Sequence, residues 1–471
     1  MIRHNCGFAV AHTLHDVYGM IRALQHRGRE AAGIAAIGDQ GIDVIKWAGT
    51  VDRVDLGDLH RILTADHHTF LAHVRYKTKG SEGDILEDAH PHVIGGRIEH
   101  RGDHIIIRDC DAAIVHNGHV NLEYLEKIDE ELLNTGCDSE RVLHYAVDNS
   151  LRGLLRNIPD AYTAAIASRE WADIALVRGR TGIKPGVLGV KDGKVVAASE
   201  DVAFRKNGAQ LIEDLTPGSL YLLDKNGEFR KERITEPTPH HCFFEWNYIG
   251  NIDSVINGVS VRRVRQTLGR VLAEQTAPDD IDFVTYLPRC PESAARVYAE
   301  KIGKPFIPVF YKLNQERAFQ GSNIGERANS IAHNLHLIDT VADQIRGKKG
   351  VIIDDSIVRG NNLVRARELM YEEARVAEAY LISYTPKIGI IGEDGIPRGC
   401  TFGVDMPPDD HFIARERSDA EISVKAGMPV RYLEREAMLR AFEDCGLDRK
   451  TLCTFCIGGP HPYKNIIPIG K

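Results

Sequence analysis

Val351 to Asn362, reading VIIDDSIVRGNN, is the stretch that decides the fold of the C-terminal half of this chain. The β-branched run after Gly350 predicts a strand buried on both faces of a parallel sheet. Ligands of such sheets bind beyond the carboxyl ends of the strands, which is where Asp354 and Asp355 follow. Two carboxylates at that edge can accept hydrogen bonds from a pair of ribose hydroxyls. We therefore expect a phosphorylated sugar to bind here.

The loop that follows predicts the phosphate site. It leads into a helix expected at Leu363–Arg375, so its backbone N–H groups and the positive end of the helix dipole suit a phosphate. Two aspartates alone would more often form a helix cap or a solvated turn. The full string from Val351 to Asn362 favours a ligand site instead. The predicted ligands are Asp354, Asp355, Ser356, Ile357, Val358, Arg359, Gly360, Asn361 and Asn362.

The full string resembles the phosphoribosyl-pyrophosphate (PRPP) motif of type I phosphoribosyltransferases. DDSIVRG is close to the form found in the amidophosphoribosyltransferase family, in which Thr-Thr usually follows the glycine. This chain has Asn361-Asn362 there, which removes the hydroxyl donors but leaves side-chain amide donors.

Length and composition set wider limits. A chain of 471 residues suggests two or three domains. With 43% hydrophobic residues and a net charge of −8, nothing favours binding to nucleic acid or to an anionic membrane. There is no apolar run of about 18 residues, and Met1–Asn5 is too short and polar for a signal peptide, so we expect a cytoplasmic protein. The chain has nine cysteines, an odd number, which argues against a framework of disulfide bonds.

The pattern of predicted elements changes along the chain. Gly7–Leu223 has short strand-like runs with few helices, one of them predicted at Glu140–Leu155, which indicates a sheet-rich α+β domain. Thr235–His241 contains two prolines and is the expected domain boundary. Beyond it strands and helices alternate, with one strand predicted at Phe306–Phe310, and this alternation implies a mostly parallel sheet. Lys312–Arg327 is polar and predicts a loop near the substrate.

A second set of motifs lies in the N-terminal half. Cys6-Gly7 is followed by five strings, at Leu24–Ile34, His73–Tyr76, Glu87–Pro91, Val115–Gly118 and Cys137–Glu140. Each string taken singly has an ordinary structural explanation. In this order and at this spacing, they resemble class II glutamine amidotransferases.

That resemblance implies that Cys6 is the nucleophile and that its own α-amine is the general base. A thiol with a pKa near 8.5 is mostly protonated at neutral pH, and an α-amine titrating near 7.7–8.0 can accept its proton. A peptide nitrogen cannot do so. We therefore expect Met1–Asn5 to be a propeptide that is removed.

The resemblance also implies roles for other residues. Asn117 and Gly118 would form the oxyanion hole. Arg75 would bind the α-carboxylate of glutamine and Asp138 its α-ammonium group. Arg27, Tyr76 and Thr78 would line the pocket. The alternatives are that Asn117-Gly118 is a hairpin turn and that Arg75 and Asp138 are members of surface ion pairs.

Together the halves resemble the glutamine PRPP amidotransferase family over nearly the full length. That family makes 5-phosphoribosylamine from glutamine and PRPP, the first step of purine biosynthesis, and passes ammonia through an internal channel. The resemblance implies Mg²⁺ at Asp354 and Asp355, pyrophosphate contact by Lys312, and a loop at Lys312–Arg327 that orders on binding. The segment Arg289–Ser293 departs from the family pattern.

Four cysteines stand in contexts that resemble the iron–sulfur branch of that family, namely Cys242, Cys400, Cys453 and Cys456. Four thiolates suit a [4Fe–4S] cluster. A Cys₄ zinc site fits the same residues, and the sequence does not separate the two.

The sequence thus predicts an N-terminal four-layer αββα Ntn-hydrolase domain and a C-terminal type I phosphoribosyltransferase domain. Their bounds are 1–5 for the propeptide, 6–238, 239–447, and 448–471 for a tail with the CxxC pair. We expect a homo-oligomer, a homotetramer or a dimer as in the family, with purine nucleotides as feedback inhibitors. The alternatives are glucosamine-6-phosphate synthase, which shares the glutaminase half, and a PRPP-sensing protein that has lost transfer.

Overall fold

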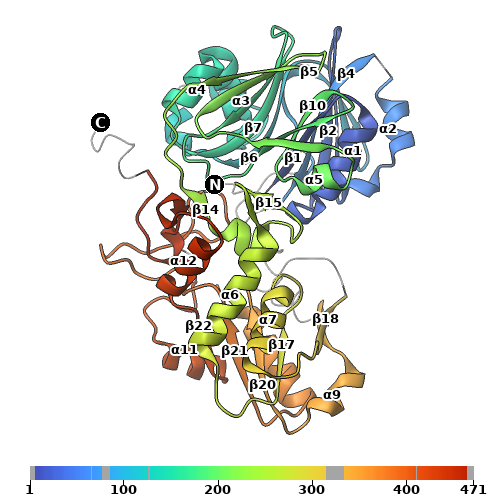
Figure 1. Cartoon of the computed structure of the whole chain (residues 1–471). Coiled ribbons are helices and arrows are strands. Elements are labelled where there is room, and N and C mark those ends of the chain that lie inside the picture. Colours follow the sequence, from blue (N-terminus) through green and yellow to red (C-terminus); the bar gives the residue numbers. More distant parts are fainter. Residues whose placement is uncertain are drawn as a thin grey trace.

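The protein is described by a computed structural model that covers residues 6–64, 66–76, 85–125, 128–313, 334–409 and 411–463. The N-terminal half is built on a large antiparallel sheet and the C-terminal half on a smaller parallel sheet (Figure 1). This mixture of α and β structure agrees with the predicted class. None of the described helices combines the length and the apolar character required to span a membrane.

The N-terminal sheet has thirteen strands within the described residues, in the order β11-β9-β10-β1-β4-β2-β3-β6-β7-β8-β12-β13, with β5 paired to β6. β6 runs for 16 residues, which lets it pair with β3, β5 and β7. The strands are β1 (Gly7–Ala11), β2 (Ala31–Gly38), β3 (Gly41–Ala48), β4 (His67–Arg75), β5 (His92–Arg101), β6 (His104–His119), β7 (Ala161–Ser168), β8 (Ile174–Arg178), β9 (Val187–Lys191), β10 (Lys194–Ala198), β11 (Gln210–Asp214), β12 (Ser219–Leu223) and β13 (Phe229–Arg233).

Alternation along the strands divides the buried side chains between separate cores. Phe8 and Val10 of β1 face a core formed almost entirely by strand residues. Ala9 and Ala11 face the opposite way, toward α1 (Leu14–Ala23), α2 (Leu56–Ile62) and α5 (Val202–Arg205). A third core lies between the sheet and the helices α3 (Asp138–Asn149) and α4 (Leu151–Asn157). Helices therefore cover outer faces, and strands pack against strands between them.

Two local predictions were wrong. The single helix predicted at Glu140–Leu155 is two helices, because Ser150 has a φ of 73° and its side chain caps the start of α4. The strand predicted at Phe306–Phe310 is interrupted: Phe306 forms a single parallel bridge with Val284 of β17 (Phe283–Tyr286), and a strand begins only at Phe310, as β18 (Phe310–Lys312), which pairs antiparallel with β19 (Leu335–Leu337). Pro308 has no N–H to donate to a sheet, which limits pairing before that point.

The C-terminal sheet confirms the parallel arrangement expected from alternation. Its order is β17-β20-β21-β22, with bounds β17 (Phe283–Tyr286), β20 (Lys349–Asp354), β21 (Glu378–Ser383) and β22 (Val430–Tyr432). Helices cover both faces: α6 (Val261–Thr276), α7 (Glu292–Ile302) and α12 (Arg435–Asp444) on one, and α9 (Asp339–Ile345), α10 (Asn361–Glu368) and α11 (Asp419–Ala426) on the other.

The two halves meet at a short junction. β14 (His241–Cys242) pairs in parallel with β23 (Leu452–Cys453), so the end of the described chain returns to the point where the C-terminal half begins (Figure 1). Beside this pair a π-helical turn, η5 (Glu245–Ile249), leads toward α6. The junction thus holds residues that are more than 200 positions apart in the sequence.

Candidate active sites

Cys6 lies at the start of β1, fully buried. Burial raises the pKa of its thiol to about 12, although a hydrogen bond from the backbone N–H of Tyr76 and the positive charges of Arg75, Lys184 and Arg27 act in the opposite direction. A thiol with this pKa is protonated at neutral pH. Among the described residues, the interactions that lower this pKa do not bring it near neutral pH, so an attacking thiolate at Cys6 needs a base.

Arg27 is placed directly behind this cysteine. Its Nε donates to the carbonyl oxygen of Cys6 at 2.8 Å, and its guanidinium binds Glu245 through two hydrogen bonds of 3.0 and 3.1 Å. It also pairs with Glu200. All three side chains are buried. Arg27 therefore holds the backbone of Cys6, and both of its carboxylate partners are residues that the sequence motifs did not single out.

Arg75 and Tyr76 end β4 next to Cys6, since Gly7 is paired with Val74. Arg75 is fully buried and donates to Asp88 at 3.0 Å. Its Nε has no hydrogen-bond partner within the described residues. The guanidinium thus has an unused donor close to the thiol. Thr78, which was also predicted to line the pocket, lies outside the described residues, as does Met1–Asn5.

Asn117 and Gly118 lie near the end of β6. They continue the strand rather than form a hairpin turn, because both pair with β7, Asn117 with Thr163 and Gly118 with Tyr162. The side chain of Asn117 is fully buried, and neither its oxygen nor its nitrogen has a hydrogen-bond partner in the described part of the chain. A buried, unsatisfied amide is unfavourable unless a ligand uses it.

Gly118 allows a close approach of backbone that no other residue permits. A Cβ atom at this position would lie 2.1 Å from the carbonyl oxygen of Ala161. The neighbouring His73 fixes the same strand, because its Nε2 lies 3.0 Å from the carbonyl oxygen of His116. β4 and β6 are thereby tied together beside Cys6.

Asp138 is the first residue of α3 and is buried. Its Oδ2 accepts a hydrogen bond from the backbone N–H of Val120 at 2.8 Å and lies 3.4 Å from Nδ1 of His119. Asp138 is therefore held against the end of β6, close to Asn117, rather than exposed in a surface ion pair.

The second site lies at the end of β20. Asp354 and Asp355 are both buried, and burial together with the charge of Asp355 raises the pKa of Asp354 well above its ordinary value. The backbone N–H of Asp355 donates to Asp354, and Ser356 donates to Asp355 at 2.8 Å. Two adjacent buried carboxylates of this kind favour a site that receives hydrogen-bond donors or a cation.

The loop after the carboxylates has the form expected of an anion site. Gly360 has a φ of 87° and precedes α10, which begins at Asn361. Ile357 and Val358 are buried, whereas Gly360, Asn361 and Asn362 are partly exposed. Arg359 instead turns away toward the segment around residue 405, donating to the carbonyl oxygen of Asp405 at 3.0 Å. Arg359 is one of the predicted phosphate ligands, and its side chain thus already binds a backbone carbonyl group.

Lys312 faces the carboxylate pair from β18. Burial lowers its pKa, while Asp354 and Asp355 raise it, and Arg289 lowers it further. Arg289 therefore lies within electrostatic range of Lys312, although it belongs to the segment that departs from the family pattern. The sequence signal for Arg289 was its position directly after β17, at the carboxyl edge of the parallel sheet.

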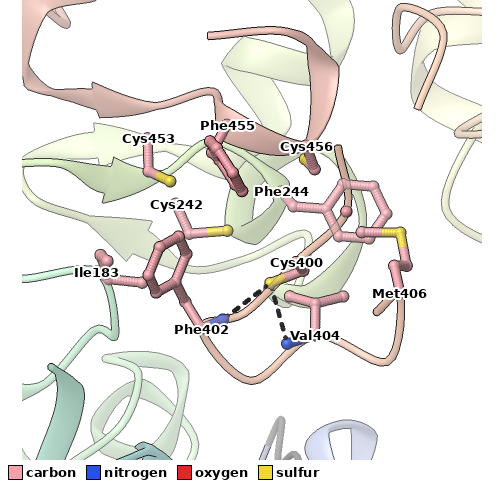
Figure 2. A pocket seen from close by; sticks show the side chains of 11 residues that line it. Ile183, Cys242, Phe244, Cys400, Phe402, Val404, Met406, Cys453, Phe455 and Cys456 are labelled. Atoms are coloured by element: carbon pink, nitrogen blue, oxygen red, sulfur yellow. Dashed lines mark hydrogen bonds between the residues drawn. The ribbon is translucent and has the colours of Figure 1, made fainter. Parts of the chain in front are cut away.

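The four cysteines of the junction converge on one small apolar cavity (Figure 2). Cys242, Cys453 and Cys456 come from β14 and the chain end, and Cys400 comes from the loop before α11. Each is buried, and none forms a disulfide. The backbone N–H groups of Phe402 and Val404 donate to Cys400 Sγ at 3.4 and 3.3 Å, as the dashed lines in Figure 2 show.

The spacing of these sulfurs differs from that of a single-ion site. Among the described residues, no three of the junction cysteines have sulfurs that all lie within 4.8 Å of one another. The group that meets this limit is His90, His92 and Cys137, in the N-terminal half. With Zn–S bonds of about 2.3 Å, tetrahedral zinc needs sulfurs roughly 3.8 Å apart. The wider spacing suits a cluster with several irons.

A continuous set of contacts connects the two sites. From Glu245, which binds Arg27, the π-helical turn η5 runs to Asn247, whose side chain donates to Thr385 at 2.8 Å. The hydroxyl of Tyr384 donates to the carbonyl oxygen of Asn247 at 2.7 Å. Ser383, at the end of β21, donates to the backbone of Asp355. The surroundings of Cys6 and the carboxylate pair are therefore joined through η5.

Three residues of these sites were missed by the sequence motifs. Glu200 follows β10, and Glu245 ends the string Cys242-Phe243-Phe244-Glu245, for which only the cysteine was given a role. Lys184 lies within electrostatic range of Cys6, His116 and Cys242. In the part of the chain that the structure describes, Lys184 thus acts on both the thiol site and the cysteine cavity.

Comparisons with known proteins cover nearly the whole chain, although no protein-family profile matches it. It is 30% identical to the amidophosphoribosyltransferase of Mycobacterium bovis over 98% of this chain and 87% of that protein. It is 28% identical to the amidophosphoribosyltransferase of Methanocaldococcus jannaschii over 94% and 93% of the two chains. A solved structure described as the allosteric regulatory enzyme of purine biosynthesis matches with a TM-score of 0.80 and 25% identity, over 98% of this chain and 97% of that one.

A second solved structure supports the fold. The glutamine PRPP amidotransferase from B. subtilis, complexed with ADP and GMP, has a TM-score of 0.80 and 24% identity over 97% of each chain. The identities and the coverage of both halves lead to one conclusion: this chain belongs to the amidophosphoribosyltransferase family.

Proposed function

We propose that this chain couples two half-reactions at the sites described above, releasing ammonia from glutamine at Cys6 and adding it to PRPP at Asp354-Asp355. As a member of its family, the chain forms 5-phosphoribosylamine, glutamate and pyrophosphate, the first step of purine biosynthesis. The observation that carries the two-site proposal is a buried thiol beside the unsatisfied amide of Asn117 in one half, and a buried carboxylate pair in the other.

In the glutaminase half-reaction, the sulfur of Cys6 attacks the side-chain carbonyl carbon of glutamine. The C–N bond then breaks as the nitrogen takes a proton from the α-amine of Cys6 and leaves as ammonia, and water hydrolyses the remaining thioester to glutamate and the free thiol. The amide of Asn117 and the backbone N–H of Gly118 donate to the oxyanion that forms. Arg75 binds the α-carboxylate and Asp138 the α-ammonium group, while Tyr76 and Thr78 line the pocket. Because burial raises the pKa of Cys6 to about 12, the thiol proton must go to the α-amine of Cys6 itself, which requires removal of Met1–Asn5.

In the transfer half-reaction, Asp354 and Asp355 accept hydrogen bonds from the ribose hydroxyls, and the loop Ser356–Asn362 binds the 5-phosphate. Lys312 and Arg289 bind the pyrophosphate group. The raised pKa of Asp354 supports a cation near this pair, and Mg²⁺, when bound, neutralises charge on the leaving pyrophosphate. Ammonia then forms the new bond to C1 as the bond to pyrophosphate breaks.

The junction cysteines would hold a [4Fe–4S] cluster, which ties β14 and β23 to the loop that carries Cys400. Four buried thiols around one apolar cavity, the hydrogen bonds to Cys400, and the spacing of the sulfurs support a cluster over a zinc ion. Such a cluster is structural, since the cavity lies at the junction and not at either reacting centre.

The remaining features follow the family proposal. The strand-only core between outer helices supports a four-layer αββα Ntn-hydrolase domain at 6–238, followed by a type I phosphoribosyltransferase domain at 239–447 and a tail at 448–471. The η5 segment would adjoin the passage for ammonia. We also propose a cytoplasmic homo-oligomer inhibited by purine nucleotides, because the B. subtilis protein was solved with ADP and GMP.

An assay of both half-reactions tests this function. The protein should release glutamate and pyrophosphate in equal amounts, and PRPP should stimulate glutamate release. A PRPP-sensing protein would bind PRPP and release neither product. Glutamate release without any effect of PRPP would contradict coupling between the sites.

A further inference from the structure

A second group of metal-ligating side chains lies in the N-terminal half, outside both reacting centres. His90, His92 and Cys137 place their ligand atoms within 4.8 Å of one another. Their exposed fractions are 0%, 1% and 0%. They come from two segments that are distant in sequence, the residues leading into β5 and the residue that precedes α3. Three buried N and S donors therefore meet at one point.

The backbone fixes each donor in place. His92 is the first residue of β5 and pairs with Ile114 of β6. Cys137 is the N-cap residue of α3, and its N–H donates to Thr135 at 3.2 Å. Gly33 of β2 lets the other segment approach closely, because a Cβ there would lie 2.2 Å from the carbonyl oxygen of His90. Neither segment can move far without disrupting the sheet.

The imidazole rings are also held by one another. The ring of His90 stacks on that of His73, with centroids 4.0 Å apart, and it meets the ring of His92 edge-on, with centroids 4.5 Å apart. Stacked and edge-on contacts restrict ring rotation before any ion binds. A preorganised set of ligands loses little entropy when a metal arrives.

We propose that His90, His92 and Cys137 form a Zn²⁺ site with one coordination position left for a water molecule. Two imidazole nitrogens and one thiolate are the donors that zinc prefers, and three protein ligands with an open position form a common zinc arrangement. On binding, Cys137 loses its thiol proton, which now lies toward Asp138 Oδ1 at 3.6 Å, and that proton passes to solvent. No oxidant or reductant takes part.

Charges around the site set its affinity. Two buried cations, Lys46 of β3 and Arg75 of β4, lie within electrostatic range of Cys137. Lys46 also lies within range of Glu140 and donates to the carbonyl oxygen of Glu87 at 3.1 Å. A dication bound by one thiolate keeps a net charge of about +1, so Lys46 opposes it and Glu140 favours it. Replacing Lys46 with an uncharged residue of similar length should therefore strengthen zinc binding.

The position of the site indicates its effect on the glutaminase half. One ligand segment carries Asp88, the partner of Arg75, and the other leads directly into Asp138. A bound zinc ion would fix these two segments relative to each other and so stabilise two walls of the pocket around Cys6. The binding of zinc itself does not depend on the proposed function.

Zinc per chain in the full-length protein tests this site. Wild type should hold one more equivalent of zinc than either Cys137→Ser or His92→Gln, measured by mass spectrometry of the metal after dialysis. Cys110→Ser is the matched control, because Cys110 is a buried cysteine of the same half whose Sγ contacts only the carbonyl of Ile107 among the hydrogen bonds described. It should bind as much zinc as wild type, and Lys46→Met should bind zinc several-fold more tightly. The junction cysteines are unchanged in all variants, so metal held there cancels.

Two further measurements on the wild-type protein test the zinc site even if a variant fails to fold. Zinc-edge X-ray absorption of the wild-type protein should show imidazole scattering, which the four-cysteine cavity cannot supply. Co²⁺ added to wild type should give a thiolate charge-transfer band that Cys137→Ser lacks and Cys110→Ser keeps. Equal zinc in wild type and in folded Cys137→Ser, or a zinc edge with sulfur scattering alone, would overturn the site.

Discussion

Arg27 and Glu245 form a fully buried, two-point ion pair across the junction of the two halves, with N–O distances of 3.0 and 3.1 Å. Arg27 also holds the carbonyl oxygen of Cys6, and Glu245 begins the η5 turn that leads to Asn247 and the carboxylate pair. A change at the acceptor site can therefore reach the backbone of the nucleophile through charged, hydrogen-bonded groups rather than through loose packing.

Removing the charge of Glu245 should weaken this junction. Glu245→Gln keeps the shape of the side chain and leaves Arg27 paired with Glu200, but it removes one of the two buried carboxylates, and a hydrogen bond to a charged group contributes about 1.5–3 kcal/mol. We expect a lower thermal midpoint and a loss of the PRPP stimulation of glutamate release. Glu232→Gln, in the exposed pair with Arg152, is the control and should change neither. Unchanged stimulation in a folded Glu245→Gln protein would show that coupling takes another route.

The reactivity of Cys6 with alkylating reagents should depend on processing and on pH. In the unprocessed chain the pKa of about 12 leaves a thiolate fraction of roughly 10⁻⁴ at pH 8, and this fraction rises with pH until about pH 12. Once Cys6 is N-terminal, its α-amine titrates near 7.7–8.0, so the rate should level off above about pH 8. Intact mass identifies the processed form, and labelling rates from pH 6 to pH 10 give the profile. Identical profiles for both forms would contradict the role of the α-amine.

Substitution at the nucleophile and at the oxyanion hole should separate the two half-reactions. Cys6→Ala should abolish glutamine use and leave synthesis from added ammonia, because the acceptor site lies in the other half. Asn117→Ala should lower glutamine-dependent kcat by roughly 10²- to 10³-fold, the usual effect of losing one oxyanion donor. Loss of the ammonia-dependent reaction in folded Cys6→Ala would contradict two separate sites.

Lys312 and Arg289 should be needed for PRPP but not for glutamine. Lys312→Ala removes a cation within electrostatic range of the carboxylate pair, and Arg289→Ala removes one within range of Lys312. Loss of a charge-assisted hydrogen bond of about 1.5–3 kcal/mol corresponds to roughly a 10- to 100-fold rise in the KM for PRPP. Glutamine hydrolysis measured without PRPP should stay near wild type. Arg296→Ala is the control, since Arg296 is an exposed arginine of α7 that pairs with Glu292. An unchanged KM for PRPP in Arg289→Ala would remove that residue from the site.

The junction cysteines should decide both iron content and stability. Anaerobically prepared protein should contain about four irons per chain and absorb broadly in the visible range, as expected for a [4Fe–4S] cluster. Cys456→Ser should lose the iron, the absorption and part of the thermal stability. Cys445→Ser keeps all four ligands and changes a buried cysteine of the same half, so it should retain the iron. Zinc in place of iron in anaerobic protein would favour the Cys₄ zinc alternative.

Most of what could be predicted about the sites came from short sequence motifs. Asp354 and Asp355 follow a strand whose β-branched residues mark it as buried, and parallel strands place their carboxyl ends at one edge. The same reasoning failed for Phe306–Phe310, where Pro308 limits pairing, and for Glu140–Leu155, where Ser150 adopts a positive φ. In both places one backbone position overrode the pattern of apolar residues.

Partners of charged and metal-ligating residues could not be predicted in this way. Arg27 was expected to line a pocket because it stands in a motif, but the sequence carries no sign that it binds a glutamate 218 positions away. The departure at Arg289–Ser293 weakened the expected PRPP site, yet the fold brings Arg289 to Lys312. His90 and Cys137 belong to separate motif strings and His92 to none, and their proximity depends on how β5 and α3 pack against β6.

The sequence by itself determined the two chemistries, because a strand followed by two aspartates, a cysteine nucleophile motif and an Asn-Gly pair are each written in adjacent residues. It also determined the parallel sheet of the C-terminal half, since alternation of strands and helices permits little else. Only the tertiary structure decided which charges lie together, namely Arg27 with Glu245 in a buried pair and Lys312 within electrostatic range of Asp354. The physical reason is that burial and pairing depend on contacts between distant segments, and such contacts leave no periodic pattern along the chain.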